Sequence, residues 1–113
     1  MKNDSAYLEH ILNAIQNINR FMKGVTEKEF LGNTEKQYAV LRAPEVIGEA
    51  SKNLSKETKA QYPEVEWTDI AGMRDKLIHQ YFGVDLALVW ETVKTNLPQL
   101  EKAVSEILVK SSH

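Results

Sequence analysis

The sequence contains no cysteine, and this absence removes several kinds of site at once. Without cysteine a chain has no disulfide bond, no thiolate metal ligand and no cysteine nucleophile. The N-terminal residues MKNDSAYLEH contain no apolar signal core, and no apolar run reaches the ~18 residues that a membrane span needs. We therefore expect a cytoplasmic protein, consistent with a reducing compartment, that does not enter a membrane.

The chain also lacks a large charge excess of either sign, since its formal net charge is -2 over 113 residues. Without a global positive field it cannot hold nucleic acid non-specifically, so any such contact must come from a local basic site. The apolar share of 42% and the charged share of 27% are ordinary for a soluble protein. The length fits a single domain over residues 1–113.

Glycine and proline are scarce, with five and three copies, so few breaks interrupt the apolar periodicity. A first helix is expected from Asp4 or Ser5, either of which can cap it, to a stop at Gly24. A short helix should follow, with Thr26 and Glu29 forming a capping box. The apolar residues of the first helix follow steps of three and four: Leu8, Ile11, Leu12, Ile15, Ile18 and Phe21.

Two longer helices are expected further along the chain. The first covers Thr34–Leu54, with Pro44 inside it, where it should kink the helix or loosen one turn. The last covers residues 85–109, is capped by Asp85 and should bend at Pro98. With a connector of short helices between them, the sequence predicts an all-α fold, an antiparallel bundle of four to five main helices with short extra helices.

The stretch AGMRDKLIHQYFGVD, at residues 71–85, is the most informative part of the chain. Its apolar pattern predicts a helix over residues 69–82, capped by Thr68 or Asp69 and ended by Gly83. At ~100° of rotation per residue, one stripe of this helix faces the core. The stripe consists of Ile70, Met73, Leu77 and Tyr81.

Arg74 lies beside that stripe, where an arginine needs a negative partner. Glu49, in the apolar context VIGEA, is the internal candidate, and a phosphate group is the external one. His79 is about 140° away from Arg74 on the same helical geometry, so the two do not share a face. A composite site, at a distorted helix end or across a two-fold dimer axis, would bring them together.

The chemistry open to these residues is narrow. His79 can donate and accept protons near neutral pH, and Arg74 can stabilise charge on phosphate oxygens. RNA carries its own nucleophile, the 2′-hydroxyl, so this pair suffices to cleave RNA without a metal or cofactor. Asp75 can orient either side chain. A structural reading stays open as well, in which Arg74 pairs with Glu49 and Tyr81 only packs.

At RDKLIHQY the sequence resembles the HepT-like branch of the HEPN superfamily, whose motif is arginine, four to six residues, then histidine. Arg74, His79 and Tyr81 fit this pattern. The resemblance covers nearly the whole chain, and Pro44 is a departure within a stretch that usually reads as uninterrupted helix. The blocks that carry it are YLEHILNAIQNINRF, EKEFLGN, AVLRAPEVIGEASKNLS, YPEVEWTDIAGMRDKLIHQYFGVDLALVW and NLPQLEKAV.

The resemblance implies a HEPN helical bundle that acts as a homodimer with the motif at its interface. It implies a metal-independent endoribonuclease toxin in which Arg74 and His79 are catalytic. It further implies that a partner antitoxin of the minimal nucleotidyltransferase type silences the toxin by transferring AMP to Tyr81. Two other hypotheses remain: a non-catalytic dimer that binds a nucleotide or a partner protein, and a helical assembly domain with a polar seam.

Overall fold

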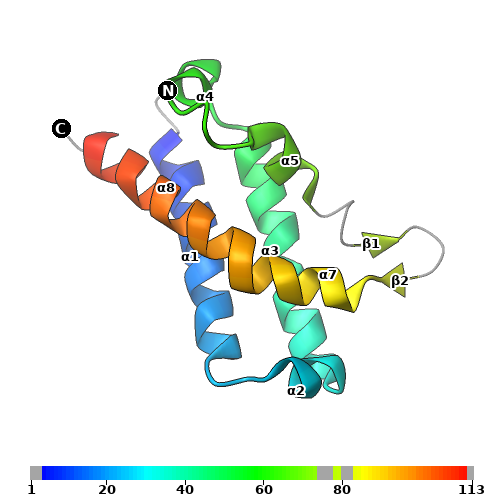
Figure 1. Cartoon of the computed structure of the whole chain (residues 1–113). Helices are drawn as coiled ribbons and strands as arrows, with labels where there is room; N and C mark the ends of the chain where they lie inside the picture. Colours follow the sequence, from blue (N-terminus) through cyan, green and yellow to red (C-terminus); the bar gives the residue numbers. More distant parts are fainter. Residues whose placement is uncertain (1–3, 74–77, 80–82, 112–113) are drawn as a thin grey trace.

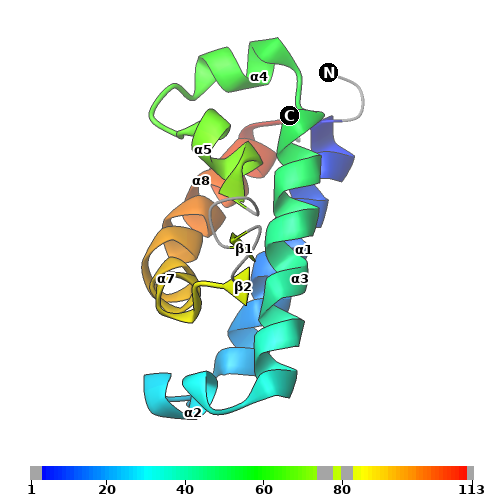
Figure 2. The same cartoon turned by 90° about the vertical axis from the view of Figure 1, so that its right-hand side faces the viewer.

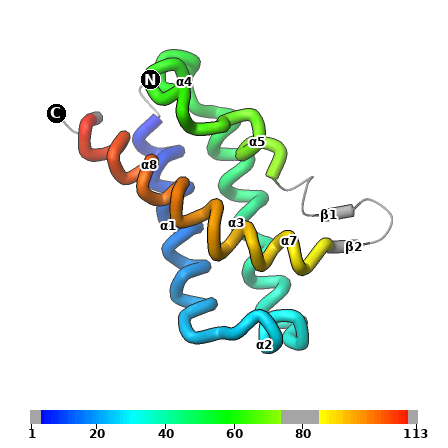
Figure 3. Tube along the Cα trace, viewed as in Figure 1, coloured from blue at the N-terminus to red at the C-terminus, as the bar shows by residue number. Residues whose placement is uncertain are grey.

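The computed structural model describes residues 4–73, 78–79 and 83–111, and these ranges are predominantly helical. The two long helices α1 and α3 lie side by side, and the continuous run of α7, η1 and α8 crosses them (Figure 1; Figure 3). The predicted all-α fold is confirmed. The elements are α1 (Asp4–Met22), α2 (Glu27–Leu31), α3 (Thr34–Lys52), α4 (Lys56–Gln61), α5 (Trp67–Ala71), β1 (Ile78–His79), β2 (Gly83–Val84), α7 (Leu86–Glu91), the π-helical turn η1 (Thr92–Asn96) and α8 (Leu97–Ser111).

Local capping signals fix most of the helix ends. The Thr26 hydroxyl accepts a hydrogen bond from the Glu29 amide while the Glu29 carboxylate accepts one from the Thr26 amide, which confirms the predicted capping box. Gly24 adopts a φ of 75°, a left-handed conformation that ends α1 as predicted. Asp85 accepts a hydrogen bond from the Leu88 amide and caps α7, also as predicted.

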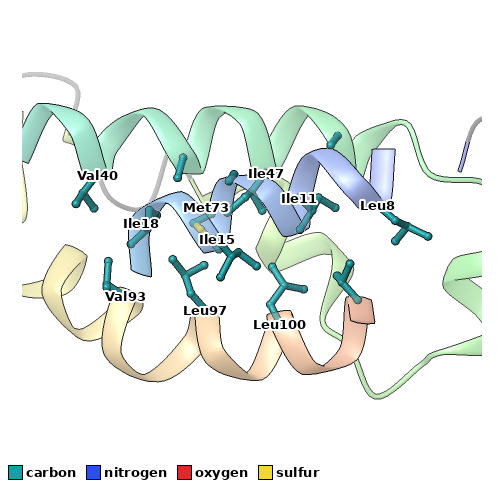
Figure 4. Packing of buried hydrophobic residues seen from close by; sticks show 14 of the residues in the cluster. Leu8, Ile11, Ile15, Ile18, Val40, Ile47, Met73, Val93, Leu97 and Leu100 are labelled. Atoms are coloured by element: carbon teal, nitrogen blue, oxygen red, sulfur yellow. The ribbon is translucent and has the colours of Figure 1, made fainter. Parts of the chain in front are cut away.

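The core lies between α1, α3 and the crossing helices (Figure 4). Ile11 and Ile15 of α1 meet Ile47 of α3 on one side and Leu97 of α8 on the other (Figure 4). Each fully buried side chain of this kind contributes roughly 1.5–3 kcal/mol to folding. Met73, beyond the end of α5, is also buried in this cluster.

A polar cluster of Asp4, Ser55 and Thr58, here called the Asp4 cluster, joins the start of α1 to the start of α4. The buried Asp4 carboxylate accepts hydrogen bonds from the Ser55 amide, at 3.1 Å, from the Ser55 hydroxyl, at 2.7 Å, and from the Thr58 hydroxyl. Burial raises the pKa of Asp4, but the hydrogen bonds from Thr58 and Ser55 outweigh it and hold the pKa below its ordinary value. Since α4 buries no side chain of its own, this cluster supplies much of its attachment.

In the part of residues 69–82 that the structure describes, the predicted helix is not continuous: Gly72 interrupts it before Met73, which is helical, and Ile78–His79 is a strand. Helix α5 begins earlier, at Trp67, so neither Thr68 nor Asp69 caps it, and it ends at Ala71, where the Gly72 amide bonds back to the Thr68 carbonyl. Glycine is a poor helix interior residue, and here it stops the helix one turn after it starts. Further on, β1 and β2 form an antiparallel pair that leads into α7 (Figure 2).

The two proline predictions have different outcomes. Pro44 lies inside α3 and is buried there, and the helix continues to Lys52. Near Pro98 the final helical run is interrupted, but by η1, whose Thr92 carbonyl accepts a hydrogen bond from the Leu97 amide five residues on. A proline cannot donate the next amide hydrogen bond, which favours an irregular turn just before it.

Among the helices that the structure describes, none has the length and apolar character to span a membrane.

Candidate functional site

The predicted site residues fall on a segment that the structure describes only in part. Arg74, Asp75 and Tyr81 lie outside the described residues. His79 is placed by its backbone, as the second residue of β1. Glu49 is described in full, as an exposed residue of α3. Whether Glu49 pairs with Arg74 therefore stays a prediction.

Two contacts fix where the segment with Arg74 begins. The backbone of α5 lies so close to α3 at Gly48 that a Cβ atom built there would be 3.0 Å from the Ala71 carbonyl oxygen. Two residues later the Met73 side chain is 8% exposed and packs in the core. Glu49 adjoins Gly48, and Arg74 adjoins Met73. The chain therefore enters the motif from a tightly held point beside the helical turn that carries Glu49.

The backbone at His79 is extended and paired. His79 pairs with Gly83, and Ile78 pairs with Val84, in an antiparallel register. The angle of about 140° between Arg74 and His79 was calculated for a continuous helix. Because His79 lies on a strand, that angle does not describe how the two residues are placed. Tyr81 lies between β1 and β2 in the sequence, and these two strands pair with each other.

A cavity of about 660 Å³, here called the α5–α8 groove, lies next to the start of the motif. One wall comes from the α4–α5 connection and α5, including Ile70 and Met73. The other wall comes from α7, η1 and α8, including Leu88 and Leu100. The volume is within the roughly 300–1,000 Å³ typical of ligand pockets. The groove is therefore large enough to receive a ligand or side chains of another molecule.

Sequence reasoning missed this groove, and no motif pointed to it. Three of its four carboxylates, Glu64, Glu66 and Asp69, fall within residues 64–69, and the fourth, Glu91, belongs to α7. The fold brings Glu91 to the same concavity as the other three, because α7, η1 and α8 form the wall opposite α5. Within the described ranges, no group of three or more histidine, aspartate or glutamate side chains is arranged to hold a metal ion.

The chain is similar to known proteins over most of its length. Residues 11–107 match the family model described as ribonuclease HepT-like. A candidate RNase of Caldanaerobacter subterraneus subsp. tengcongensis is 46% identical over 110 residues, covering 97% of this chain and 98% of that protein. A probable ribonuclease HepT of Thermococcus cleftensis is 48% identical over 95 residues, covering 84% of this chain and 86% of that protein.

A candidate RNase of Methanocaldococcus jannaschii is 46% identical over 103 residues, covering 91% of this chain and 89% of that protein. No solved structure matches the chain significantly. The family match spans most of the sequence, and three relatives align over nearly their whole length. The predicted resemblance is confirmed, and the chain belongs to the ribonuclease HepT-like family.

Proposed function

We propose that this protein is a metal-independent endoribonuclease, the toxin of a toxin–antitoxin pair in the HEPN superfamily. The observation that carries the proposal is the combination of the family match over residues 11–107 with Arg74, His79 and Tyr81 at the motif spacing. The relatives are named as ribonucleases, which supports RNA as the substrate.

In the proposed reaction the ribose 2′-hydroxyl loses its proton to a histidine and attacks the adjacent phosphorus. The bond from phosphorus to the 5′-oxygen breaks, and that oxygen takes up a proton. The products are a 2′,3′-cyclic phosphate and a 5′-hydroxyl. His79 supplies proton transfer, and the Arg74 guanidinium stabilises the negative charge that develops on the phosphate oxygens. Asp75 and Glu49 are proposed as supporting residues that orient His79 or Arg74.

A homodimer completes the proposed site. One histidine cannot both accept the 2′ proton and donate to the leaving oxygen in the same instant, whereas two copies of the motif around a two-fold axis supply both. The backbone of His79 belongs to β1 and pairs with Gly83 of β2, so His79 lies on a strand rather than on a helix. This placement is compatible with a site completed by a second copy.

Tyr81 is proposed as the regulatory residue. A partner nucleotidyltransferase would attach AMP to its hydroxyl, which adds a phosphate and an adenosine two residues from His79. The added negative charge and bulk would oppose entry of an RNA phosphate into the proposed site of Arg74 and His79.

The proposal is tested by cleavage of RNA in EDTA with protein whose intact mass shows no AMP on Tyr81. We expect wild type to produce cyclic-phosphate ends and His79→Ala to lose at least about 100-fold in rate, the usual size of a lost general acid–base group. The matched control is His10→Ala, because His10 is an exposed histidine on α1 that the proposal does not use.

Full cleavage by His79→Ala would show that His79 has no catalytic role. No cleavage by verified unmodified wild type across several RNA pools would instead favour the non-catalytic dimer that binds a nucleotide or a partner protein. Nucleotides added one at a time would then be expected to raise the unfolding temperature of the protein, since a specific ligand stabilises the folded state by mass action.

A further inference from the structure

The floor of the α5–α8 groove is apolar. Met73 and Leu100 are buried beneath it, and Ile70 is half-buried. Leu88 is 37% exposed, so part of its apolar side chain is in contact with water. An exposed leucine beside a half-buried isoleucine, within one concavity, offers apolar area that a second molecule can remove from water.

The rim of the same groove is acidic. Glu64, Glu66 and Asp69 are exposed on one wall, and Glu91 is exposed on the other. Within the described part of the chain, the lining includes no lysine, arginine or histidine. Glu64 on one side and Glu91 on the other, above an apolar floor, concentrate negative potential in the groove. The groove therefore favours a cationic occupant.

The charge of the rim argues against RNA as that occupant. A phosphate entering the groove would approach the Glu64 and Glu91 carboxylates, and like charges repel at short range even at physiological salt. A small inorganic cation would leave the apolar floor uncovered. An occupant that satisfies both features carries basic groups at its edges and apolar groups at its centre.

We propose that the α5–α8 groove is the docking site for a basic, amphipathic segment of a partner protein. Lysine or arginine side chains of that segment face Glu64 and Glu91 across the groove, and its apolar side chains cover Ile70 and Leu88. The long aliphatic stems of lysine and arginine suit such a site, because they pack on apolar surface while their charged ends reach the rim. An amphipathic segment in a groove is a common mode of protein recognition.

The position of the groove gives docking a consequence for the motif. Met73 belongs to the floor and directly precedes Arg74, so an occupant touches the chain one residue before the proposed phosphate clamp. The opposite wall includes Thr92 and Asn96, at the two ends of the π-helical turn η1. Turns of this kind occur often at functional sites. Control of RNA cleavage through the groove rests on the proposed function, whereas docking itself does not.

The test measures the binding of a fluorescein-labelled peptide by fluorescence anisotropy. The peptide has about 15 residues, with leucine at helical spacing and arginine or lysine at the flanking positions. A second peptide has glutamine in place of every basic residue. We expect the basic peptide to bind wild type, to bind more weakly as NaCl rises from about 50 to about 300 mM, and the glutamine peptide to bind at least roughly tenfold more weakly.

Two double variants separate the groove from the general charge of the protein. Glu64→Gln with Glu91→Gln is expected to weaken binding of the basic peptide roughly tenfold or more. Glu9→Gln with Glu35→Gln removes the same charge from exposed positions on α1 and α3 that do not line the groove, and should leave binding unchanged. Circular dichroism verifies that both variants are folded.

A third variant tests the cavity without changing its charge. Ala103 is a half-buried residue of α8 that lines the groove, so Ala103→Phe should fill the space and abolish binding. Equal binding by all variants, or equal loss in both double variants, would overturn the proposal.

Other occupants give distinct results. Displacement of the peptide by a short RNA would assign the groove to the substrate. A change of oligomeric state in Glu64→Gln with Glu91→Gln, seen by light scattering, would assign it to a second copy of this chain. Either result overturns the proposal. Because the binding assay uses no RNA cleavage, an inactive wild type would contradict the proposed function and leave the docking result standing.

Discussion

The close approach of α3 and α5 at Gly48 makes a sharp prediction about how the motif is positioned. Replacing Gly48 with alanine puts a Cβ atom 3.0 Å from the Ala71 carbonyl oxygen, whereas an ordinary contact needs at least 3.4 Å. The neighbour is backbone rather than the flexible end of a side chain, so α5 must move away by a few tenths of an ångström. The displaced helix leads directly into Arg74.

Two opposing terms set the size of the effect on stability. Alanine is the better helix former, and this favours the variant by about 1 kcal/mol. Overpacking against a fixed neighbour costs about 1–3 kcal/mol. We therefore expect Gly48→Ala to lower the free energy of unfolding by about 1 kcal/mol, and the bulkier Gly48→Val to lower it by roughly 3 kcal/mol.

Urea denaturation followed by circular dichroism measures both values, and RNA cleavage by the folded variants measures the effect on the motif. Gly32→Ala is the matched control, since a Cβ atom there meets its nearest neighbour, the Lys28 carbonyl oxygen, at an ordinary 3.6 Å. Cleavage should fall in Gly48→Ala and persist in Gly32→Ala. A Gly48→Ala protein as stable as wild type, or more so, would refute the tight contact between α3 and α5.

Two further predictions concern polar groups on α1 and α3. Asp4→Asn should lower the free energy of unfolding by about 1–3 kcal/mol at pH 7, because it removes a charged acceptor from Ser55 and Thr58. Folding lowers the pKa of Asp4, so its carboxylate contributes fully to the free energy of unfolding above pH 3.8, its ordinary pKa. This contribution is lost as the pH falls through the pKa of the folded state. The stabilities of wild type and variant should therefore converge in acid unfolding curves. Ser51→Ala should raise the free energy of unfolding by about 0.5–1.5 kcal/mol in urea melts, because the buried Ser51 hydroxyl has no hydrogen-bond partner within the described structure; a less stable variant would contradict this reasoning.

The sequence predicted the helices that depend on local signals. Helix α1 has an apolar stripe and a glycine at its end, and α2 has its capping box. Helix α3 begins at Thr34 as expected, and α7 begins after the predicted cap Asp85. Each of these features is set by residues within one or two helical turns. The fold class therefore followed from periodicity and caps alone.

The motif region shows where this kind of reasoning fails. Residues 69–82 have a helical apolar pattern, yet among those described α5 ends at Ala71, Met73 is helical again, and Ile78 and His79 pair with a strand. Two β-strands of two residues each give no detectable alternation, so periodicity cannot distinguish them from a helical stretch. Ile78 pairs with Val84 only six positions on, but so short a pairing carries no strand pattern of its own in the sequence.

The α5–α8 groove could not have been predicted for a different reason. Glu64 and Glu91 are 27 positions apart and belong to no common motif, so only the packing of α7, η1 and α8 opposite the α4–α5 connection brings them to one cavity. Read along the sequence, each is an ordinary surface carboxylate. Sites built from side chains of several elements become visible only once the tertiary arrangement is known.

The Asp4 cluster also makes the attachment of α4 to the rest of the protein sensitive to pH. Helix α4 buries no side chain, so protonation of Asp4 would free it while the core beneath stays packed. Hydrogen exchange of the α4 amides should therefore rise once the pH falls below 3.8, the ordinary pKa of Asp4, and before global unfolding. Because the connection after α4 supplies Glu64 to the α5–α8 groove, local opening of this corner would change the shape of the groove and leave the core intact.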